Sequence, residues 1–272
     1  MIINCKSDLD RRIEKTNLNV LESGIAIIDE SWRCDDVLSV YNRVYYIIEG
    51  DGANLGSESE HIVMKPGHIY LIPNGYRYRY WCEGIVKKVY FHISIKRNDG
   101  YDALSGFKKI GVIDDAETVK RIERLYQNDY SYSCLAIKGE LMKTVAGIAE
   151  KYRLGIVDGD ENEYSLVIRR AVKYIQKNLS IKLSRGEIAE HCRVSAGKLA
   201  ICFKSELGVS VGKYIDDLVL MEAMRRLTYT EDPIAVISED LGFCDQFYFS
   251  RRFRELCRIS PLKYRRKMQN SK

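Results

Sequence analysis

The sequence predicts an α+β protein with a β-barrel in its first half and an all-α domain in its second. Between about Ile25 and Ile95, short runs rich in Tyr, Val and Ile alternate with turn-forming stretches such as Gly50–Gly52 and Pro66–Gly67. Several short strands at this spacing are typical of a closed or nearly closed barrel, or of a jelly roll. Beyond Asp114 the apolar residues recur at helical intervals instead.

The strands are expected most clearly at Tyr45–Ile48, Ile69–Ile72, Tyr76–Trp81 and Val86–Ile95. Two helices should follow, one after a cap at Asp114–Asp115 and one between about 135 and 149. The segment 155–163 (GIVDGDENE) is acidic and has no periodicity, which is typical of a linker. We therefore expect a barrel domain at 1–154 for effector sensing or dimerisation, a linker at 155–163, and a helical domain at 164–272.

The net charge of +5 hides a division along the 272-residue chain. Residues 164–272 hold 21 Lys and Arg against 12 Asp and Glu, a charge of +9, whereas residues 1–163 hold 22 against 26, a charge of −4. A basic domain suits a polyanion, because each phosphate contact releases counterions. The chain has no apolar run of membrane-spanning length and no signal-peptide stretch, so we expect a cytoplasmic protein without a membrane partner.

Two similar units in the last hundred-odd residues have the pattern of a helix-turn-helix. In the first, Ser184 and Glu187 form a capping-box pair, and Ser195 is placed to cap the next helix. Leu199 and Phe203, at i and i+4, would pack back on the preceding helix. In this arrangement the second helix can enter the major groove of DNA.

The second unit repeats the arrangement and carries a longer motif. It consists of Leu241–Arg254 (LGFCDQFYFSRRFR), with Asp245 as the cap, followed by Ser260–Arg265 (SPLKYR). On this motif, the span Ile168–Arg266 resembles the AraC/XylS regulators, which place two such units on either side of a long helix. The resemblance implies a sequence-specific transcriptional regulator, and the sequence leaves open whether it acts as an activator or as a repressor. Its expected partners are double-stranded DNA, RNA polymerase and a second copy of the chain.

The resemblance also assigns roles on the second recognition helix. Carried over position by position, Gln246, Phe247 and Arg251 face the bases. Arg can bond two groups of guanine and Gln two groups of adenine, which suits that role. Arg252 and Arg254 are expected to hold phosphates, which fixes register without reading sequence.

The first recognition helix departs from the family pattern. Ile201 stands where an Arg is usual, Lys198 is the polar candidate on the same face, and Lys204 is a further basic candidate. We expect Ile201 to contact thymine methyl groups, or this unit to depend on DNA shape. Elsewhere, Val219 replaces a usual Arg and Arg258 a usual Gly.

In the first half, Gly67–Tyr78 (GHIYLIPNGYRY) resembles the second conserved motif of cupins, G-x5-P-x-G-x2-H, except that Tyr78 replaces the metal-binding His. Upstream, Arg43 and Tyr45 stand where cupins carry two His, followed by Glu49. The eight cysteines include no CxxC pair, which argues against a zinc site. We therefore expect a cupin-like barrel that serves as a receptor, with no metal and no other cofactor.

Strand alternation puts Arg43, Tyr45 and Glu49 on one face of their strand, and three tyrosines on one face of another. Lining a lumen, the Arg would bind an anion or a hydroxyl group, and the rings would stack on a sugar or a planar molecule. The same tyrosines can also be plain strand formers on a half-buried sheet. The candidate effector residues are Arg43, Tyr45, Glu49, Tyr76, Tyr78, Tyr80 and His92.

Three functions remain open at this level. The first is an effector-responsive, DNA-binding regulator. The second is a cupin enzyme such as an isomerase or dioxygenase, which the missing metal ligands oppose. The third keeps the DNA-binding role but makes the barrel a protein-docking or dimerisation surface. The helices between Asp115 and Tyr152 could pair two copies or cover their own barrel.

Overall fold

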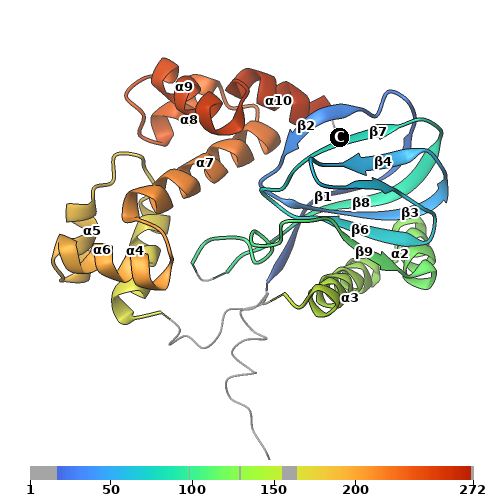
Figure 1. Ribbon diagram of the computed structural model, residues 1–272, viewed down its shortest axis with the longest axis horizontal. Coiled ribbons are helices and arrows are strands. Elements are labelled where there is room, and N and C mark those ends of the chain that lie inside the picture. The colour runs from blue at the N-terminus through green and yellow to red at the C-terminus, as the bar shows by residue number, and fades with distance from the viewer. Residues whose placement is uncertain (1–16, 98, 129, 155–163, 271–272) are drawn as a thin grey trace, which may run out of the picture. The chain divides into compact units, whose positions relative to one another are not determined.

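The computed structural model describes residues 17–97, 99–128, 130–154 and 164–270, which form two compact units. The first unit contains β-strands and two helices, and the second is helical and also includes Asp99–Tyr101. The protein is therefore α+β, with antiparallel sheets in its N-terminal part and helices in its C-terminal part (Figure 1). No helix of the described residues is both long and apolar enough to cross a membrane. The predicted linker at 155–163 lies outside the described residues.

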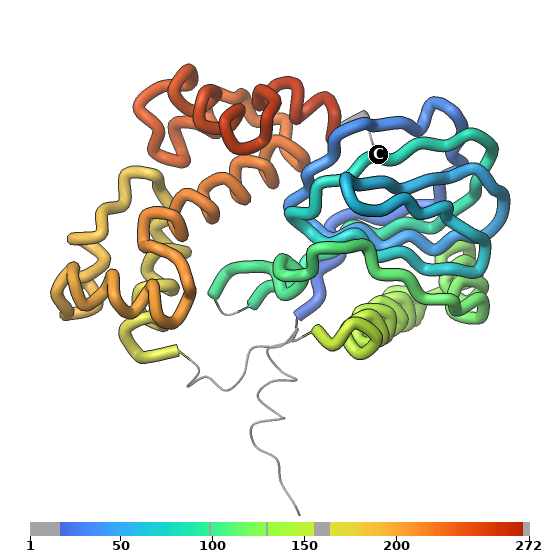
Figure 2. Tube along the Cα trace, viewed as in Figure 1, coloured from blue at the N-terminus to red at the C-terminus, as the bar shows by residue number. Residues whose placement is uncertain are grey.

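The strands form two antiparallel sheets (Figure 2). The five-stranded sheet has the order β1-β8-β3-β6-β9 and consists of β1 (Leu18–Ile28), β8 (Val86–Ile95), β3 (Asn42–Gly50), β6 (His68–Ile72) and β9 (Gly111–Asp114). The four-stranded sheet has the order β2-β7-β4-β5 and consists of β2 (Cys34–Leu38), β7 (Arg77–Cys82), β4 (Ala53–Gly56) and β5 (His61–Val63).

The sequence suggested a closed or nearly closed barrel, or a jelly roll, and of these the closed barrel is not formed. Closure needs a continuous ladder of hydrogen bonds around the strands. Among the described residues, no ladder joins an edge strand of one sheet to an edge strand of the other. The four-stranded sheet ends at β5, which is three residues long.

Four strands, β3, β6, β7 and β8, cover most of the segments that the sequence predicted. The prediction missed β1, an edge strand of eleven residues with the sequence LNVLESGIAII. Most of its side chains are exposed or half-buried, so its apolar residues do not mark a single buried face.

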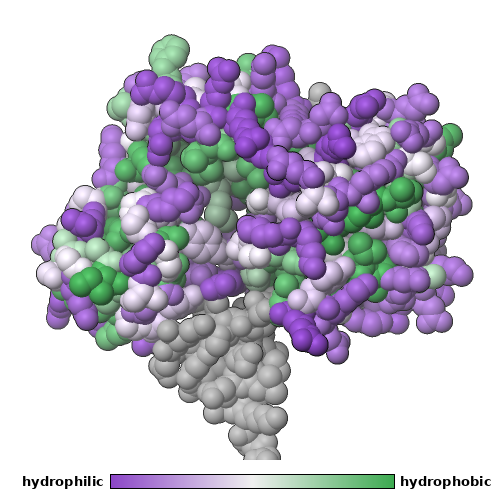
Figure 3. Space-filling view, viewed as in Figure 1, coloured by the Kyte–Doolittle hydropathy of each residue, from purple (hydrophilic) through white to green (hydrophobic). Residues whose placement is uncertain are grey.

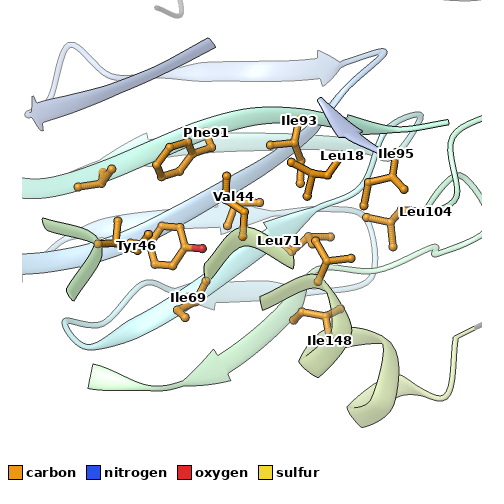
Figure 4. Close-up of a cluster of buried hydrophobic side chains, with 14 of the residues drawn as sticks. Leu18, Val44, Tyr46, Ile69, Leu71, Phe91, Ile93, Ile95, Leu104 and Ile148 are labelled. Atoms are coloured by element: carbon orange, nitrogen blue, oxygen red, sulfur yellow. The ribbon is translucent and has the colours of Figure 1, made fainter. Parts of the chain in front are cut away.

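Helices α2 (Ala116–Asn128) and α3 (Ser133–Tyr152) pack on one face of the five-stranded sheet (Figure 1). The buried side chains on this face are almost wholly apolar, and Figure 4 shows them as one cluster. They include Val44 and Tyr46 of β3, Val89, Phe91, Ile93 and Ile95 of β8, and Leu141, Val145 and Ile148 of α3. Because side chains alternate along a strand, the residues between these on β3 and β8 face the opposite way.

The helical unit contains two helix pairs separated by the long helix α7 (Val211–Tyr229) (Figure 1). The first pair is α5 (Arg185–Cys192) and α6 (Ala196–Glu206), preceded by α4 (Leu166–Lys177). The second pair is α8 (Ile234–Asp240) and α9 (Gln246–Cys257), followed by α10 (Pro261–Asn270). This arrangement is the one expected from the sequence.

The predicted caps are confirmed. The Ser184 hydroxyl accepts a hydrogen bond from the Glu187 amide, and the Glu187 carboxylate accepts one from the Ser184 amide (2.8 Å). Ser195 caps α6, and the Asp245 carboxylate accepts from the Tyr248 amide (2.7 Å) to cap α9. Each cap provides an acceptor for an amide that the first turn leaves unpaired, which fixes where each recognition helix begins.

Helix α9 ends at Arg258, which has a left-handed backbone with φ of 65°. A side chain in this conformation crowds the following carbonyl group, and glycine is free of that penalty. The usual glycine at this position of the family motif therefore has a structural reason, and Arg258 departs from the pattern at an energetic cost.

We predict that Arg258→Gly raises the free energy of unfolding by about 0.5–1 kcal/mol, because it relieves this strain. Arg254→Gly, in the body of the same helix, should lower it by about 1 kcal/mol. Urea denaturation of the two variants and the wild type measures both changes. An Arg258→Gly variant as unstable as Arg254→Gly would contradict the prediction.

Candidate DNA-binding surface and inter-sheet cluster

Helix α6 presents the residues predicted to face DNA in the first unit. Lys198, Ile201 and Lys204 are exposed, and Ile201 is 66% exposed despite its apolar side chain. Leu199 and Phe203 on the opposite side are fully buried, which fixes the face that α6 turns to solvent. An exposed isoleucine on a recognition helix can contact thymine methyl groups.

Helix α9 presents a different set. Gln246, Phe247, Arg251 and Arg254 are all exposed, and Phe247 is 87% exposed. The Arg251 guanidinium lies 5.3 Å from the centroid of the Tyr248 ring, a cation–π distance that limits the positions of its side chain. This face therefore offers two side chains that can form paired hydrogen bonds with bases.

Arg252 has a different environment from its neighbours. Its guanidinium donates to Asp216 on α7 (3.0 Å) and to Glu255 one turn later (3.3 Å), and its side chain is about one-third exposed. In this structure Arg252 links α9 to α7. Its predicted contact with a phosphate stays a prediction.

The face of the helical unit visible in Figure 3 is mainly hydrophilic, with hydrophobic side chains between the polar ones. DNA recognition combines these two features, since charged groups bind phosphates and apolar groups can reach base methyls.

The second candidate site lies between the two sheets. We call it the inter-sheet cluster, and it consists of Glu22, Trp32, Tyr41, Arg43, Tyr45, Tyr78, Tyr80, Lys88 and His92. The cluster occupies the face of β3 and β8 that points away from α2 and α3. In their register, Arg43 lies opposite His92, and Ile47 lies opposite Lys88.

Arg43 is buried and held by hydroxyl groups. Its guanidinium donates to the Tyr41 hydroxyl (3.0 Å), the Ser39 hydroxyl (3.2 Å) and the Tyr45 hydroxyl (3.3 Å). A guanidinium keeps its charge in such a site, so these bonds hold a permanent cation between the sheets.

Lys88 is the second buried basic residue of the cluster, with 3% of its surface exposed. Its amino group lies 3.9 Å from the centroid of Trp32 and 3.9 Å from that of Tyr45. Burial, reinforced by the positive charge of Arg43, lowers the pKa of Lys88 well below its usual value. The permanent cation of Arg43 and an amine that gives up its proton easily therefore share one interior.

His92 and Glu22 form the other polar part of the cluster. His92 Nδ1 lies 3.2 Å from a Glu22 carboxylate oxygen, and the His92 ring stacks on Tyr41 at 4.4 Å. The Tyr90 hydroxyl also donates to Glu22 (3.3 Å). Burial lowers the pKa of His92 to about 4, and its bond to Glu22 only partly opposes this effect.

The four-stranded sheet contributes Tyr78 and Tyr80, both buried. Tyr80 stacks on Trp32 at 4.2 Å, and Trp32 meets Tyr45 edge-on at 6.3 Å. The Tyr78 hydroxyl is buried and has no hydrogen-bond partner among the described residues. A buried hydroxyl without a partner is uncommon, which makes Tyr78 a candidate contact for another molecule.

Two of the predicted effector residues lie elsewhere. Glu49 is exposed, because a bulge between Ile47 and Glu49 breaks the alternation and pairs Glu49 with Lys87. Tyr76 precedes β7, and its hydroxyl donates to Glu60 (2.8 Å). The structure brings together the other five predicted residues, Arg43, Tyr45, Tyr78, Tyr80 and His92.

Sequence reasoning missed Lys88, Trp32 and Tyr41. Period-two alternation along β8 could have found Lys88, since it shares the parity of His92 while Val89 and Phe91 face the helices. Trp32 lies on the loop between β1 and β2, where no strand pattern indicates its direction. In the described parts of the chain, no group of three His, Cys, Asp or Glu residues could hold a metal ion.

Two capped helix pairs with exposed second helices define the class of the second unit, a helix-turn-helix DNA-binding domain. Residues 188–267 match the family described as "Helix-turn-helix domain". The multiple antibiotic resistance protein MarA of Salmonella typhimurium is 31% identical over 104 residues, which are 38% of this chain and 82% of MarA. The chain belongs to the AraC/XylS family of transcriptional regulators.

Two other relatives are named as operon regulators, not as enzymes. The arabinose operon regulatory protein of Escherichia coli K12 is 33% identical over 99 residues, 36% of this chain, and the match spans about a third (34%) of that protein. The raffinose operon transcriptional regulatory protein RafR of Pediococcus pentosaceus is 23% identical over 236 residues, 82% of this chain and 84% of RafR.

One solved structure covers most of the residues of both units. Unsaturated fatty acid-bound ToxT from Vibrio cholerae strain SCE256 has a TM-score of 0.55 and 15% identity, over 92% of this chain and 96% of ToxT. At this identity the likeness concerns the fold alone.

We predict that His92 stays neutral down to about pH 4, as its lowered pKa requires. Such a His stabilises the fold above its unfolded pKa of about 6.5, and this contribution is lost as the pH falls through about 4. As the pH falls from about 6.5 to about 4, the free energy of unfolding should fall by about 3 kcal/mol more in the wild type than in His92→Gln. Chemical denaturation at several pH values measures this difference. A His92 imidazole that protonates near pH 6.5 by NMR would contradict the burial on which the prediction rests.

Proposed function

We propose that the chain is a sequence-specific DNA-binding transcriptional regulator whose N-terminal domain binds a small-molecule effector. The observation that carries the DNA-binding role is the pair of capped helix-turn-helix units with exposed second helices, α6 and α9. Residues 164–272 would bind DNA, residues 1–154 would sense the effector, and residues 155–163 would connect the two.

Within this proposal, the two recognition helices act differently. Gln246 and Arg251 on α9 read base edges by paired hydrogen bonds, and Phe247 adds apolar contact. On α6, Ile201 contacts a thymine methyl, and Lys198 and Lys204 approach the backbone. Arg254 holds a phosphate. Arg252 would hold one as well, and its guanidinium can do so with or without its bond to Asp216.

We predict that a fragment of residues 164–272 binds double-stranded DNA by itself, with affinity that falls steeply as salt rises. Its charge of +9, from 21 Lys and Arg against 12 Asp and Glu, supports this. MarA supports it too, since 82% of its length is the matching region. Titration of labelled DNA at several salt concentrations measures it. Binding that does not change with salt, or no binding at low salt, would refute the prediction.

A second prediction separates base reading from phosphate binding. Arg251→Ala should weaken binding to the selected DNA site by roughly ten- to a hundredfold, since a good bidentate contact is worth about 1–3 kcal/mol. It should also relax sequence preference at one position. Ile201→Ala should cost less, and mainly at a thymine. Arg254→Ala, the control for a phosphate contact, should weaken all sequences alike.

Sites selected from a random DNA pool provide the substrates, and circular dichroism confirms that each variant is folded. If Ile201→Ala is more damaging than Arg251→Ala, the assignment of base reading to α9 fails. Equal weakening of all sequences by Arg251→Ala would make Arg251 a phosphate contact.

The inter-sheet cluster supports the effector role, with the first unit acting as a cupin-like receptor. Aromatic rings and an Arg in one interior suit a hydroxylated, planar or anionic small molecule. RafR, which aligns with most of this chain, is named for a raffinose operon, and ToxT was solved with a fatty acid. Both names support a small molecule as the signal.

One observation favours a second role for the first unit, as a dimerisation surface. Tyr130 and Tyr132 stack at 5.1 Å just before α3, and Leu135 is exposed on its first turn. An exposed apolar group of this kind is typical of an interaction site. Sedimentation of the full chain measures self-association, and RNA polymerase remains a proposed further partner.

A further inference from the structure

The two faces of the five-stranded sheet differ in chemistry more than a structural sandwich requires. The face under α2 and α3 buries aliphatic and aromatic side chains. The inner face of a sandwich ordinarily buries the same kinds of residue. Here it buries Arg43, Lys88 and His92 as well, beside tyrosines and Ile47. Taking cations out of water is costly unless they gain partners, so the stability of the fold does not explain this choice.

The described residues of the inter-sheet cluster include more basic than acidic groups. Arg43 is a permanent cation, burial lowers the pKa of Lys88 well below its usual value, and His92 is neutral near pH 7 because its pKa lies at about 4. Glu22 contributes a carboxylate and bonds to His92 and Tyr90. When Lys88 is protonated, these four residues carry one more positive than negative charge.

Lys88 is the residue that this imbalance affects most. The interactions of its ammonium are with the faces of Trp32 and Tyr45. Aromatic faces attract a cation, but more weakly than an anion does in a buried site. The buried Tyr78 hydroxyl, which has no hydrogen-bond partner in the described parts of the chain, lies in the same interior.

We propose that the effector bound at the inter-sheet cluster is an anion, a small molecule with one carboxylate or phosphate group on a carbon framework that stacks on aromatic rings. This inference rests on the effector role proposed above and narrows it to one class of ligand. The acidic group pairs with Lys88 and is approached by Arg43, and the Tyr78 hydroxyl donates to it. The rings of Trp32 and Tyr80 pack against the framework.

The position of Trp32 allows such a ligand to enter. Trp32 lies on the β1–β2 loop and is half-buried, whereas Tyr45 and Tyr80 lie on strands and are fully buried. Its ring can leave the Lys88 ammonium without breaking a ladder of either sheet. The anion then replaces the indole face as the partner of Lys88.

The test compares ligands that differ only in charge. Thermal unfolding of the full chain is measured with glucose against glucuronate and glucose 6-phosphate, and with benzyl alcohol against benzoate. An anion that binds the folded state raises the melting temperature, and its neutral counterpart does not. Lys88→Met should abolish the shift. Lys87→Met should keep it, because Lys87 lies on the other face of β8 and pairs with Glu123 (2.7 Å).

A second readout needs no ligand. Lys88→Met should leave the melting temperature of the free protein unchanged or raise it, because methionine fills similar space without a buried charge. A Lys88 with a purely structural role on the two rings would give a less stable variant.

The proposal is overturned if a neutral compound shifts the melting temperature and its anion does not, or if none of the three anions shifts it. A ligand response retained in Lys88→Met also overturns it. Measuring DNA binding on the same samples separates the proposed function from the proposed class of ligand. A free protein that binds no DNA contradicts the proposed function, whereas a response to neutral ligands alone contradicts only the anionic class.

Discussion

The N-terminal unit depends on one constraint, the strict alternation of side chains along β3 and β8. One parity of these strands gives Val44, Tyr46, Phe91 and Ile93 to the core under α2 and α3. The other parity is then free to carry polar groups, because the apolar burial that stabilises the unit is already supplied on the first face. A one-residue slip would exchange the two faces and place Lys88 in the aliphatic core.

The polar face of the sheet tolerates buried charge because its side chains interact with one another. Three hydroxyl groups accept hydrogen bonds from the Arg43 guanidinium, and two rings lie close to the Lys88 ammonium. Such partners reduce the cost of burying charge without cancelling it, since neutral hydroxyls and ring faces interact with a cation more weakly than a carboxylate does. A site that keeps a residual cost of this kind gains most from a ligand that removes it, and ligand binding then also stabilises the receptor.

The sequence predicted the helical unit better than the sheet unit, and the reason is the range of the interactions. A cap such as Ser195 or Asp245 acts within three residues, so its signal can be read locally. The position of Glu49 depends on a bulge, and the position of Trp32 depends on a stack with Tyr80 from another strand. Neither the bulge nor the stack produces a pattern in the local sequence. The position of Lys88 does follow from a local pattern, because Lys88 and His92 are four residues apart on one strand and face the same way. A lysine in a strand usually faces water, so the sequence analysis did not place Lys88 in the interior.

The three residues Arg251, Arg252 and Arg254 show how helix geometry separates basic residues that composition treats alike. Successive positions on a helix point about 100° apart. With Phe249 and Phe253 fixed in the core, Arg251 and Arg254 project to solvent, and Arg252 reaches Asp216 on α7. An ion pair whose side chains are about one-third exposed adds little stability, about 1 kcal/mol or less. The main effect of this ion pair is on the direction of the side chains, since it draws the Arg252 guanidinium toward α7 while Arg251, beside Tyr248, stays at the surface. This difference supports the separate roles proposed for the two residues.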